Sequence, residues 1–238
     1  MGGVNLNYID VEESLFSGFN NTVGLPKEAL YRLRGIELLP EDVHHILYVD
    51  IDILCVSDSI KDVFNHQWDI NFRIAAVPDA GISDRYSEGI MGRALQSYFN
   101  AGVLFINVDY CREFGLWKHS RKLLEGNTFK AVDQDILNIL FRDKYYPLSN
   151  RFNYMSPQVF KDMMFYRKKN LMTGFDPILI HFDGPHKPWY SVCANPYKER
   201  FNNYQRELNL ITSRKLKRSF IYKLKIILQF LKIEFASL

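Results

Sequence analysis

The sequence predicts an α/β layered domain with a largely parallel sheet, because apolar strand-like runs alternate with helical patterns along the chain. Of its 238 residues, 47% are hydrophobic and 15% are aromatic, which allows a sizeable core and excludes global disorder. A basic segment follows residue 195 and is predicted to be a separate C-terminal tail.

Each element is predicted from a local pattern. Residues 5–10 are expected to form an edge strand and residues 26–33 a helix, since Pro26 suits a first helical turn. Apolar runs predict strands over residues 46–49, 74–77, 103–107 and 178–182, and helical spacing predicts helices over 111–125 and 133–141. Asn195-Pro196 marks the expected boundary between a domain of residues 1–195 and an extension of residues 196–238.

Cysteine usage and hydropathy exclude several classes of protein. Cys55, Cys111 and Cys193 are odd in number and form no CxxC pair, which argues against a disulfide framework and a structural zinc site. No apolar stretch reaches the ~18 residues that span a bilayer, and the N-terminus lacks a basic and apolar signal sequence. A cytoplasmic location is therefore expected.

Asp50 and Asp52 directly follow the apolar run of residues 46–49. Ligand groups collect beyond the carboxyl ends of parallel strands, and residues i and i+2 of extended backbone point to the same side. Two carboxylates that converge repel each other unless a cation lies between them, and Mg²⁺ or Mn²⁺ prefers such oxygen ligands. The pair by itself is a weak signal, because Asp-x-Asp occurs often by chance and two solvated acids that end a strand are the alternative.

Three further motifs place polar residues beside strands or helices. An Asn-Ala-Gly turn is expected before one apolar run, polar residues open a helical pattern, and a strand leads into a Gly/Pro loop. The residues concerned are Asn100, then Asp133, Gln134 and Asp135, and then His181, Gly184 and Lys187. With the Asp-x-Asp pair, in this order and at these separations, the motifs resemble glycosyltransferase family 8. Within that family, the similarity is to bacterial lipopolysaccharide galactosyl- and glucosyltransferases, and it runs from about Tyr8 to Trp189.

The resemblance implies a GT-A-like fold, in which a mixed, mostly parallel sheet is flanked by helices. It implies retaining transfer of glucose or galactose from UDP-glucose or UDP-galactose to a hexose of the lipopolysaccharide core, with Mn²⁺ (or Mg²⁺) as cofactor. Asp50, Asp52 and His181 would be the metal ligands, a donor set that suits Mn²⁺. The alternative for His181 is a core histidine that hydrogen-bonds to backbone.

Other residues match family positions that contact the donor. Lys187 would offset negative charge on the leaving diphosphate, and Gly184 would let the backbone approach the phosphates, although an ordinary Gly/Pro turn is the alternative. Arg32 matches an arginine that reaches the donor, and otherwise would be a solvated helix residue. Asp79 and Asn100 match positions that hydrogen-bond to the donor sugar, where Asp79 could equally belong to a simple turn.

Asp133 and Gln134 match the pair beside the anomeric carbon, and Asp133 could also be a helix N-cap. Gln134 is a poor nucleophile, and the reach of Asp135 is open. We therefore expect same-face attack by the acceptor hydroxyl through an oxocarbenium-like state rather than a covalent intermediate. The leaving phosphate would take the acceptor's proton, and the Gln134 carbonyl would ease the developing charge.

The tail from residue 198 to 238 has ten Lys/Arg against three Asp/Glu. At helical spacing, residues 214–235 place an apolar stripe beside a basic one, which predicts an amphipathic helix lying on the anionic inner-membrane surface. A helix packed on the domain is the alternative. Nucleic acid is not an expected partner, because the basic residues lack an accompanying recognition fold.

The N-terminus departs from the family pattern. Family members begin with a further strand and an acidic turn that holds the nucleotide base, and nothing before Tyr8 matches that unit. The chain is therefore expected to be N-terminally truncated, and a catalytically impaired remnant is the rival to an active transferase. A metal-dependent phosphoesterase is a third candidate, which the Asn-Ala-Gly and His-x-x-Gly-x-x-Lys motifs disfavour.

Overall fold

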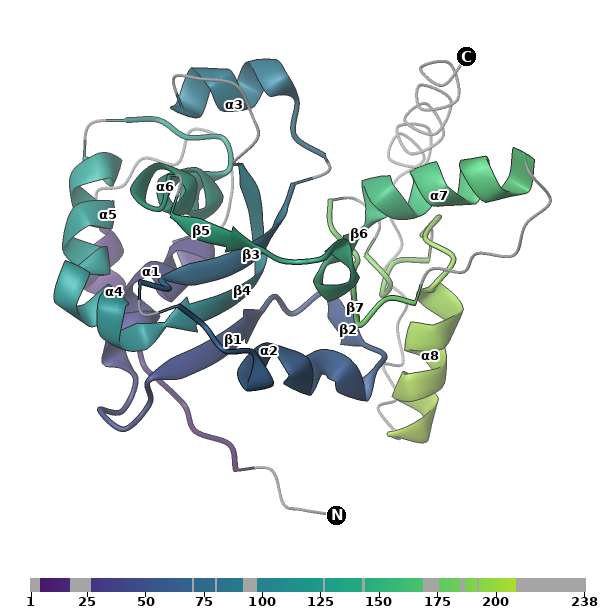
Figure 1. Ribbon diagram of the computed structural model, residues 1–238, viewed down its shortest axis with the longest axis horizontal. Helices are drawn as coiled ribbons and strands as arrows, with labels where there is room; N and C mark the ends of the chain where they lie inside the picture. Colours follow the sequence, from purple (N-terminus) through teal and green to yellow (C-terminus); the bar gives the residue numbers. More distant parts are fainter. Residues whose placement is uncertain are drawn as a thin grey trace. The chain divides into compact units, whose positions relative to one another are not determined.

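The computed structural model describes residues 5–17, 27–69, 71–79, 81–91, 98–125, 127–142, 144–168, 176–184, 187–191 and 193–208. The chain divides into two compact units. Unit 1 consists of Met1–Tyr48 and Gln67–Leu148, and unit 2 consists of Val49–His66 and Ser149–Leu238. Figure 1 labels the helices and strands of both units.

A four-stranded mixed sheet forms the centre of unit 1. Its order is β1 (His45–Val49), β4 (Phe99–Asn107), β3 (Ile74–Pro78) and β5 (Tyr145–Pro147). β3 pairs antiparallel with β4, where Ile74 lies opposite Ile106, and it pairs parallel with β5. The two inner strands β3 and β4 are almost wholly buried, as their long apolar runs require.

Helices pack on this sheet to form the core of unit 1. The helical segments are η1 (Glu13–Phe16), η2 (Lys27–Leu30), α1 (Tyr31–Gly35), η3 (Ile36–Leu38), α3 (Asp84–Met91), α4 (Val108–Phe114), α5 (Leu116–Leu124) and α6 (Val132–Leu140). Alternate strand residues such as Leu104 and Ile106 meet Leu116 of α5 and Ile136 of α6 in the core. In Figure 1, α5 and α6 lie side by side next to the sheet, and α4 leads into α5.

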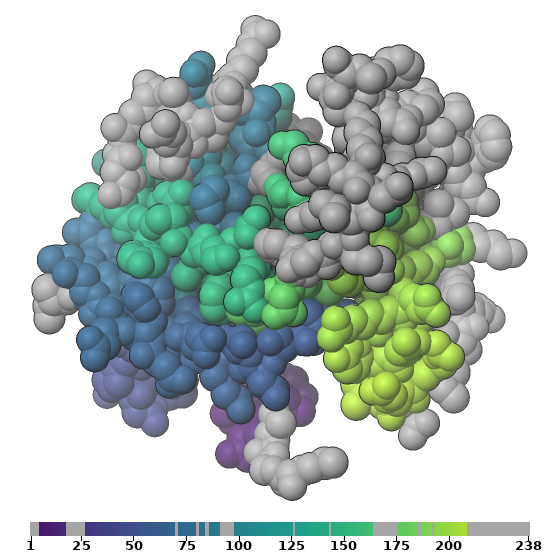
Figure 2. Space-filling model, turned by 45° about the vertical axis from the view of Figure 1, so that its right-hand side comes forward, coloured from purple at the N-terminus to yellow at the C-terminus, as the bar shows by residue number. Residues whose placement is uncertain are grey.

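Unit 2 contains a smaller sheet of three short strands in the order β2 (Ile53–Cys55), β7 (Leu179–His181) and β6 (Tyr154–Met155). β2 runs antiparallel to β7, and β6 runs parallel to it. The helical segments are η4 (Asp58–Lys61), α2 (Asp62–Asn65), η5 (Asn150–Phe152), α7 (Ser156–Lys168) and α8 (Lys198–Glu207). No residue of α8 is buried, and Figure 2 shows this yellow-green helix at the surface.

The predicted α/β class with a helix-flanked mixed sheet is confirmed, and the four apolar runs form β1, β3, β4 and β7. The helix predicted over residues 26–33 corresponds to η2 and α1, and the one over 133–141 corresponds to α6. Among the described residues, four strand pairings have a defined direction. β3–β5 and β6–β7 are parallel, and β3–β4 and β2–β7 are antiparallel.

Three predicted elements differ from the structure. Residues 5–10 form no strand, and all six are exposed, so they lack the half-buried surface that stabilises one. Asn100, Ala101 and Gly102 belong to β4 instead of a turn, because pairing within a buried sheet outweighs their local turn preference. The helix predicted over residues 111–125 is two helices, which Gly115 separates.

The tail is described only as far as residue 208. The amphipathic helix predicted for residues 214–235 lies outside the described residues, so membrane attachment through the tail stays a prediction, as does the domain boundary at 195/196. Within the described residues, no helix combines the length and the apolar character needed to cross a bilayer.

Replacing Gly115 should destabilise the protein through backbone conformation alone. Gly115 has a φ of 71°, and an added Cβ would meet nothing closer than the Lys118 Cβ at 3.8 Å. Gly115→Ala should therefore lower the free energy of unfolding by about 1–2 kcal/mol in a denaturant titration. The control is Gly89→Ala within α3, where an added Cβ meets no atom within 4 Å and helix propensity should raise stability by about 0.5–1 kcal/mol. Equal effects of the two substitutions would contradict this explanation.

Candidate functional site

Asp50, Asp52 and His181 form a cluster in unit 2. Asp50 and Asp52 lie in the turn between β1 and β2, which the Ile53 N–H closes by donating to the Asp50 carbonyl at 3.2 Å. The Phe182 N–H donates to the Asp52 carbonyl at 3.0 Å and ties the turn to the end of β7. One ligand atom from each of the three side chains lies within 4.8 Å of the others. Asp52 and His181 are buried, and Asp50 is half-buried.

The cluster keeps Asp52 negatively charged. Its Oδ1 lies 3.5 Å from His181 Nε2, and its Oδ2 forms an ion pair with Lys187 Nζ. Burial raises the pKa of Asp52, but a hydrogen bond from His181 when its Nε2 bears a proton, together with the charge of Lys187, more than offsets burial and lowers the pKa to about 2. Two carboxylates and an imidazole at this separation form a mixed oxygen and nitrogen donor set, which is the chemistry that Mn²⁺ and related divalent ions bind.

The loop after β7 brings Lys187 to this cluster. Gly184 has a φ of 59°, a left-handed conformation that side-chain-bearing residues rarely adopt. An added Cβ at Gly184 would meet no atom of the described residues within 4 Å. The backbone conformation, rather than a lack of room for a side chain, therefore favours glycine at this position. Its predicted role in letting the backbone approach phosphates stays a prediction.

A second group of polar side chains holds Gln134 in unit 1. Gln134 Oε1 accepts from the Ala101 N–H at 2.9 Å and from Asn100 Nδ2 at 3.2 Å. Its Nε2 donates to Asp79 Oδ2 at 2.9 Å and to the Tyr98 hydroxyl at 3.3 Å. A backbone N–H can only donate and a carboxylate can only accept, so these bonds determine the orientation of the Gln134 amide. Asn100 Nδ2 also donates to Asp79 Oδ2 at 3.1 Å, which joins the three side chains.

Asp135 is buried beneath this group and is fully hydrogen-bonded. The hydroxyls of Tyr86 and Tyr98 each donate to its carboxylate at 2.6 Å, and the Ala131 N–H donates at 3.0 Å. Burial and the Asp135 carboxylate raise the pKa of both tyrosines, so both hydroxyls remain donors. A nucleophilic role for Asp135 would require it to leave these partners.

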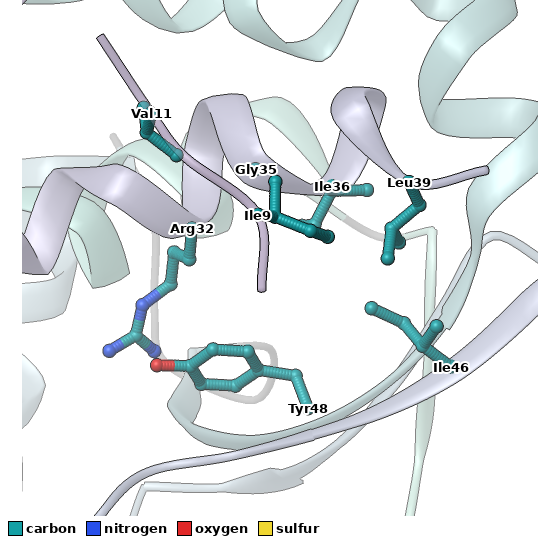
Figure 3. Close-up of a pocket in the computed structure, with 8 residues that line it drawn as sticks. All are labelled: Ile9, Val11, Arg32, Gly35, Ile36, Leu39, Ile46 and Tyr48. Atoms are coloured by element: carbon teal, nitrogen blue, oxygen red, sulfur yellow. The ribbon is translucent and has the colours of Figure 1, made fainter. Parts of the chain in front are cut away.

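Arg32 joins Asp133 to the sheet of unit 1. Its Nη1 donates to the Ala101 carbonyl at 2.6 Å, its Nε lies 3.1 Å from Asp133 Oδ2, and its guanidinium carbon lies 4.3 Å from the Tyr48 ring centroid. Figure 3 shows Arg32 and Tyr48 converging at one end of a pocket of about 200 Å³. The rest of the pocket is lined by Ile9, Val11, Gly35, Ile36, Leu39 and Ile46.

Asp133 is not the N-cap of its helix, which corrects one of the alternatives that the sequence left open. The N-cap of α6 is Ala131, whose side chain makes no capping bond, and the helix begins at Val132. Asp133 lies within the first turn and pairs with Arg32 instead. Arg32 is likewise no solvated helix residue, because its side chain is only 10% exposed.

The predicted site residues thus fall into two groups. Unit 2 brings together Asp50, Asp52, His181, Gly184 and Lys187, and unit 1 brings together Arg32, Asp79, Asn100, Asp133, Gln134 and Asp135.

Sequence reasoning missed the supporting residues in unit 1. Tyr86 and Tyr98 hold Asp135, and Asn138 clamps the start of β4 through the Phe99 N–H at 2.8 Å and the Phe99 carbonyl at 2.9 Å. Tyr98 stands two positions before Asn100, which was a usable signal because such residues share a side in extended chain.

A family model described as glycosyl transferase family 8 matches residues 7–193. General stress protein A of Bacillus subtilis is 26% identical over 214 residues, which cover 85% of this chain and 73% of that protein. Lipopolysaccharide 1,2-glucosyltransferase of Escherichia coli K12 is 27% identical over 177 residues, which cover 70% of this chain and 50% of that protein. The chain spans about half the length of several curated relatives that it matches, between 50% and 57%.

Among solved structures, the fold is similar to that of the galactosyltransferase LgtC crystallised with donor and acceptor sugar analogs. The TM-score is 0.69 at 28% sequence identity, and the match covers 84% of this chain and 74% of that chain. The likeness supports the GT-A-like description of the fold.

Removing the Asp135 carboxylate should cost stability. In Asp135→Ala, the hydroxyls of buried Tyr98 and half-buried Tyr86 and the Ala131 N–H lose their acceptor, so the free energy of unfolding should fall by at least about 3 kcal/mol in a urea titration. Glu88→Ala on α3 removes an exposed carboxylate and should change stability by less than about 0.5 kcal/mol. A small effect of Asp135→Ala would show that its carboxylate is not held as described.

Proposed function

Because the chain belongs to glycosyl transferase family 8, we propose that it transfers a glucosyl or galactosyl unit from a UDP-sugar to a hexose of a lipopolysaccharide core. Support for this acceptor comes from the relative named as a lipopolysaccharide glucosyltransferase. Support for a hexosyl donor comes from that relative and from the likeness to galactosyltransferase LgtC. The proposal places the chain where its membrane-anchored acceptor is made, on the inner membrane surface.

The observation that carries the proposal is the cluster of Asp50, Asp52 and His181, whose ligand atoms lie within 4.8 Å of one another. These residues would hold Mn²⁺ (or Mg²⁺) through two carboxylates and one imidazole nitrogen. A bound divalent ion supplies Lewis acid stabilisation to the oxygens of a departing diphosphate. Asp52 is suited to this role because its low pKa keeps it ionised at neutral pH.

Lys187 would provide a second positive charge for the diphosphate. Its ammonium group already lies at the cluster, where it pairs with Asp52. A flexible lysine side chain can exchange one anionic partner for another, and its compact charge then offsets the charge that develops on the leaving group. Gly184, three positions before this lysine, has a left-handed backbone conformation.

The unit 1 group would read the donor sugar. Asp79, Asn100 and Gln134 offer fixed donors and acceptors, and sugar hydroxyls demand such directional partners. In the proposed retaining reaction, the acceptor hydroxyl attacks on the face that the diphosphate leaves, and the leaving phosphate takes its proton. Gln134 Oε1 already receives two hydrogen bonds, so easing positive charge at the anomeric carbon would require it to release one.

A retaining reaction without a covalent intermediate also agrees with the position of Asp135. Its carboxylate receives two tyrosine hydroxyls and one backbone N–H and is fully buried. A nucleophile must approach the anomeric carbon closely, whereas this carboxylate is buried and engaged by three hydrogen-bond donors.

The direct test is Mn²⁺-dependent hydrolysis or transfer of UDP-glucose or UDP-galactose by the full chain. Asp52→Ala removes a proposed ligand and should reduce the rate at least about 100-fold, because a catalytic metal contributes several kcal/mol. Asp58→Ala removes an exposed carboxylate a few residues further along the same segment and should keep the wild-type rate. Absence of any Mn²⁺-dependent reaction would favour an impaired remnant, and release of phosphate from simple esters would favour a phosphoesterase.

A further inference from the structure

We propose that Asn153 is a positioning residue that fixes His181 in the tautomer whose Nε2 can bind a metal ion. The inference rests on the proposed function, since it concerns the same metal cluster. Asn153 belongs to none of the motifs that the sequence singled out, and in the chain it lies 28 positions before His181.

The fold of unit 2 holds Asn153 beneath the histidine. Asn153 is wholly buried at the end of η5, and its N–H donates to the Asn150 carbonyl at 3.2 Å. The next two residues form β6, which pairs parallel with β7 so that Met155 lies opposite His181. Pairing of the two strands therefore places the buried Asn153 side chain beside the His181 ring.

The contact between the two side chains determines which ring nitrogen bears the proton. Asn153 Oδ1 lies 2.9 Å from His181 Nδ1. An amide oxygen only accepts, so Nδ1 must donate, and in a neutral imidazole the lone pair is then on Nε2. Metal-binding histidines commonly receive their orientation from such an acceptor behind the ring.

The other side of the ring points to the cluster. His181 Nε2 lies 3.5 Å from Asp52 Oδ1. In the tautomer that Asn153 selects, a nitrogen lone pair and a carboxylate oxygen face each other, which is unfavourable unless a cation lies between them. The opposite orientation of the Asn153 amide would donate to Nδ1 and leave an N–H on Nε2 toward Asp52, which would prevent metal binding there.

The backbone of His181 is held independently of its ring. The Ser156 hydroxyl donates to the His181 carbonyl at 3.4 Å, and Asn195 Nδ2 donates to Ser156 Oγ at 3.3 Å. Asn195 is also buried in unit 2, and its side-chain amide donates to Ser156 Oγ and accepts from the Tyr197 N–H. It therefore provides a matched control, since its replacement removes a buried amide from the same unit without touching the tautomer.

The first test reads the tautomer directly in the full wild-type chain. Long-range ¹H–¹⁵N correlation of the imidazole nitrogens should report a protonated Nδ1 and an unprotonated Nε2 for His181. The signal is assigned by its loss in His181→Gln, which separates it from the other five histidines. A protonated Nε2 with an unprotonated Nδ1 would overturn the proposal, and this measurement does not depend on any Asn153 variant folding.

The second test measures Mn²⁺ affinity by the electron paramagnetic resonance signal of the free ion. Asn153→Leu should bind Mn²⁺ about 10- to 100-fold more weakly than wild type, because it removes the acceptor behind a metal-binding histidine. Asn153→Asp keeps an acceptor oxygen and should bind at least as tightly as wild type. Asn195→Leu should bind Mn²⁺ with wild-type affinity.

The outcomes separate this inference from the proposed function. If wild type binds Mn²⁺ and Asn153→Leu binds it equally well, the role of Asn153 is refuted while the metal cluster stands. If Asn195→Leu weakens binding as much as Asn153→Leu does, the effect comes from general loss of buried packing, and the positioning role is again refuted. If wild type binds no Mn²⁺, the proposed function fails first.

Discussion

The pairing of β2 with β7 is the constraint on which the metal cluster depends. It sets Ile53 opposite His181, and the bond from the Phe182 N–H to the Asp52 carbonyl extends the same contact by one residue. Asp52 and His181 are 129 positions apart, yet this register leaves only 3.5 Å between Asp52 Oδ1 and His181 Nε2. A slip of one residue would turn His181 to the opposite face of the strand and dismantle the cluster.

Unit 1 uses side chains, rather than strand pairing, to fix its functional residues. The Gln134 amide accepts from the Ala101 N–H of β4, and one turn later Asn138 bonds both backbone groups of Phe99. Helix α6 is thereby fixed along the start of β4. The cost of burying these amides is offset because each of the bonds has a determined donor and acceptor. The same bonds give Asp79 and Asn100 the fixed orientations that recognition of a sugar would require.

Interactions between residues close in sequence could be predicted from the sequence, and interactions between distant residues could not. The strand before Asp50 is local and was predictable from pattern, but the two aspartates converge through a turn rather than through the extended backbone that the prediction assumed. His181 as a third ligand needed the resemblance to a family, because no pattern links residues 129 positions apart. The role of Asn153 could not be predicted from the sequence for the same reason, because it arises only when β6 pairs with β7.

Errors in the sequence predictions arose where tertiary contacts outweigh local preference. Asn100 to Gly102 has the composition of a turn, but these residues are buried within strand β4. Asp133 is a residue type that caps helices well, but the half-buried Arg32 nearby offers a stronger, charged partner. At Gly115, by contrast, the structural signal is local. Its backbone is left-handed, and a glycine inside a predicted helix indicates a possible helix break.

The claim that matters most is that Asp50, Asp52 and His181 bind one manganese ion directly. Pulsed electron paramagnetic resonance tests this claim without reference to activity. The sample is Mn²⁺ bound to the full chain, whose histidines are labelled with ¹⁵N. The account predicts coupling to a single directly bound imidazole nitrogen, and this coupling should disappear in His181→Ala. Manganese bound only through oxygen ligands and water would contradict it.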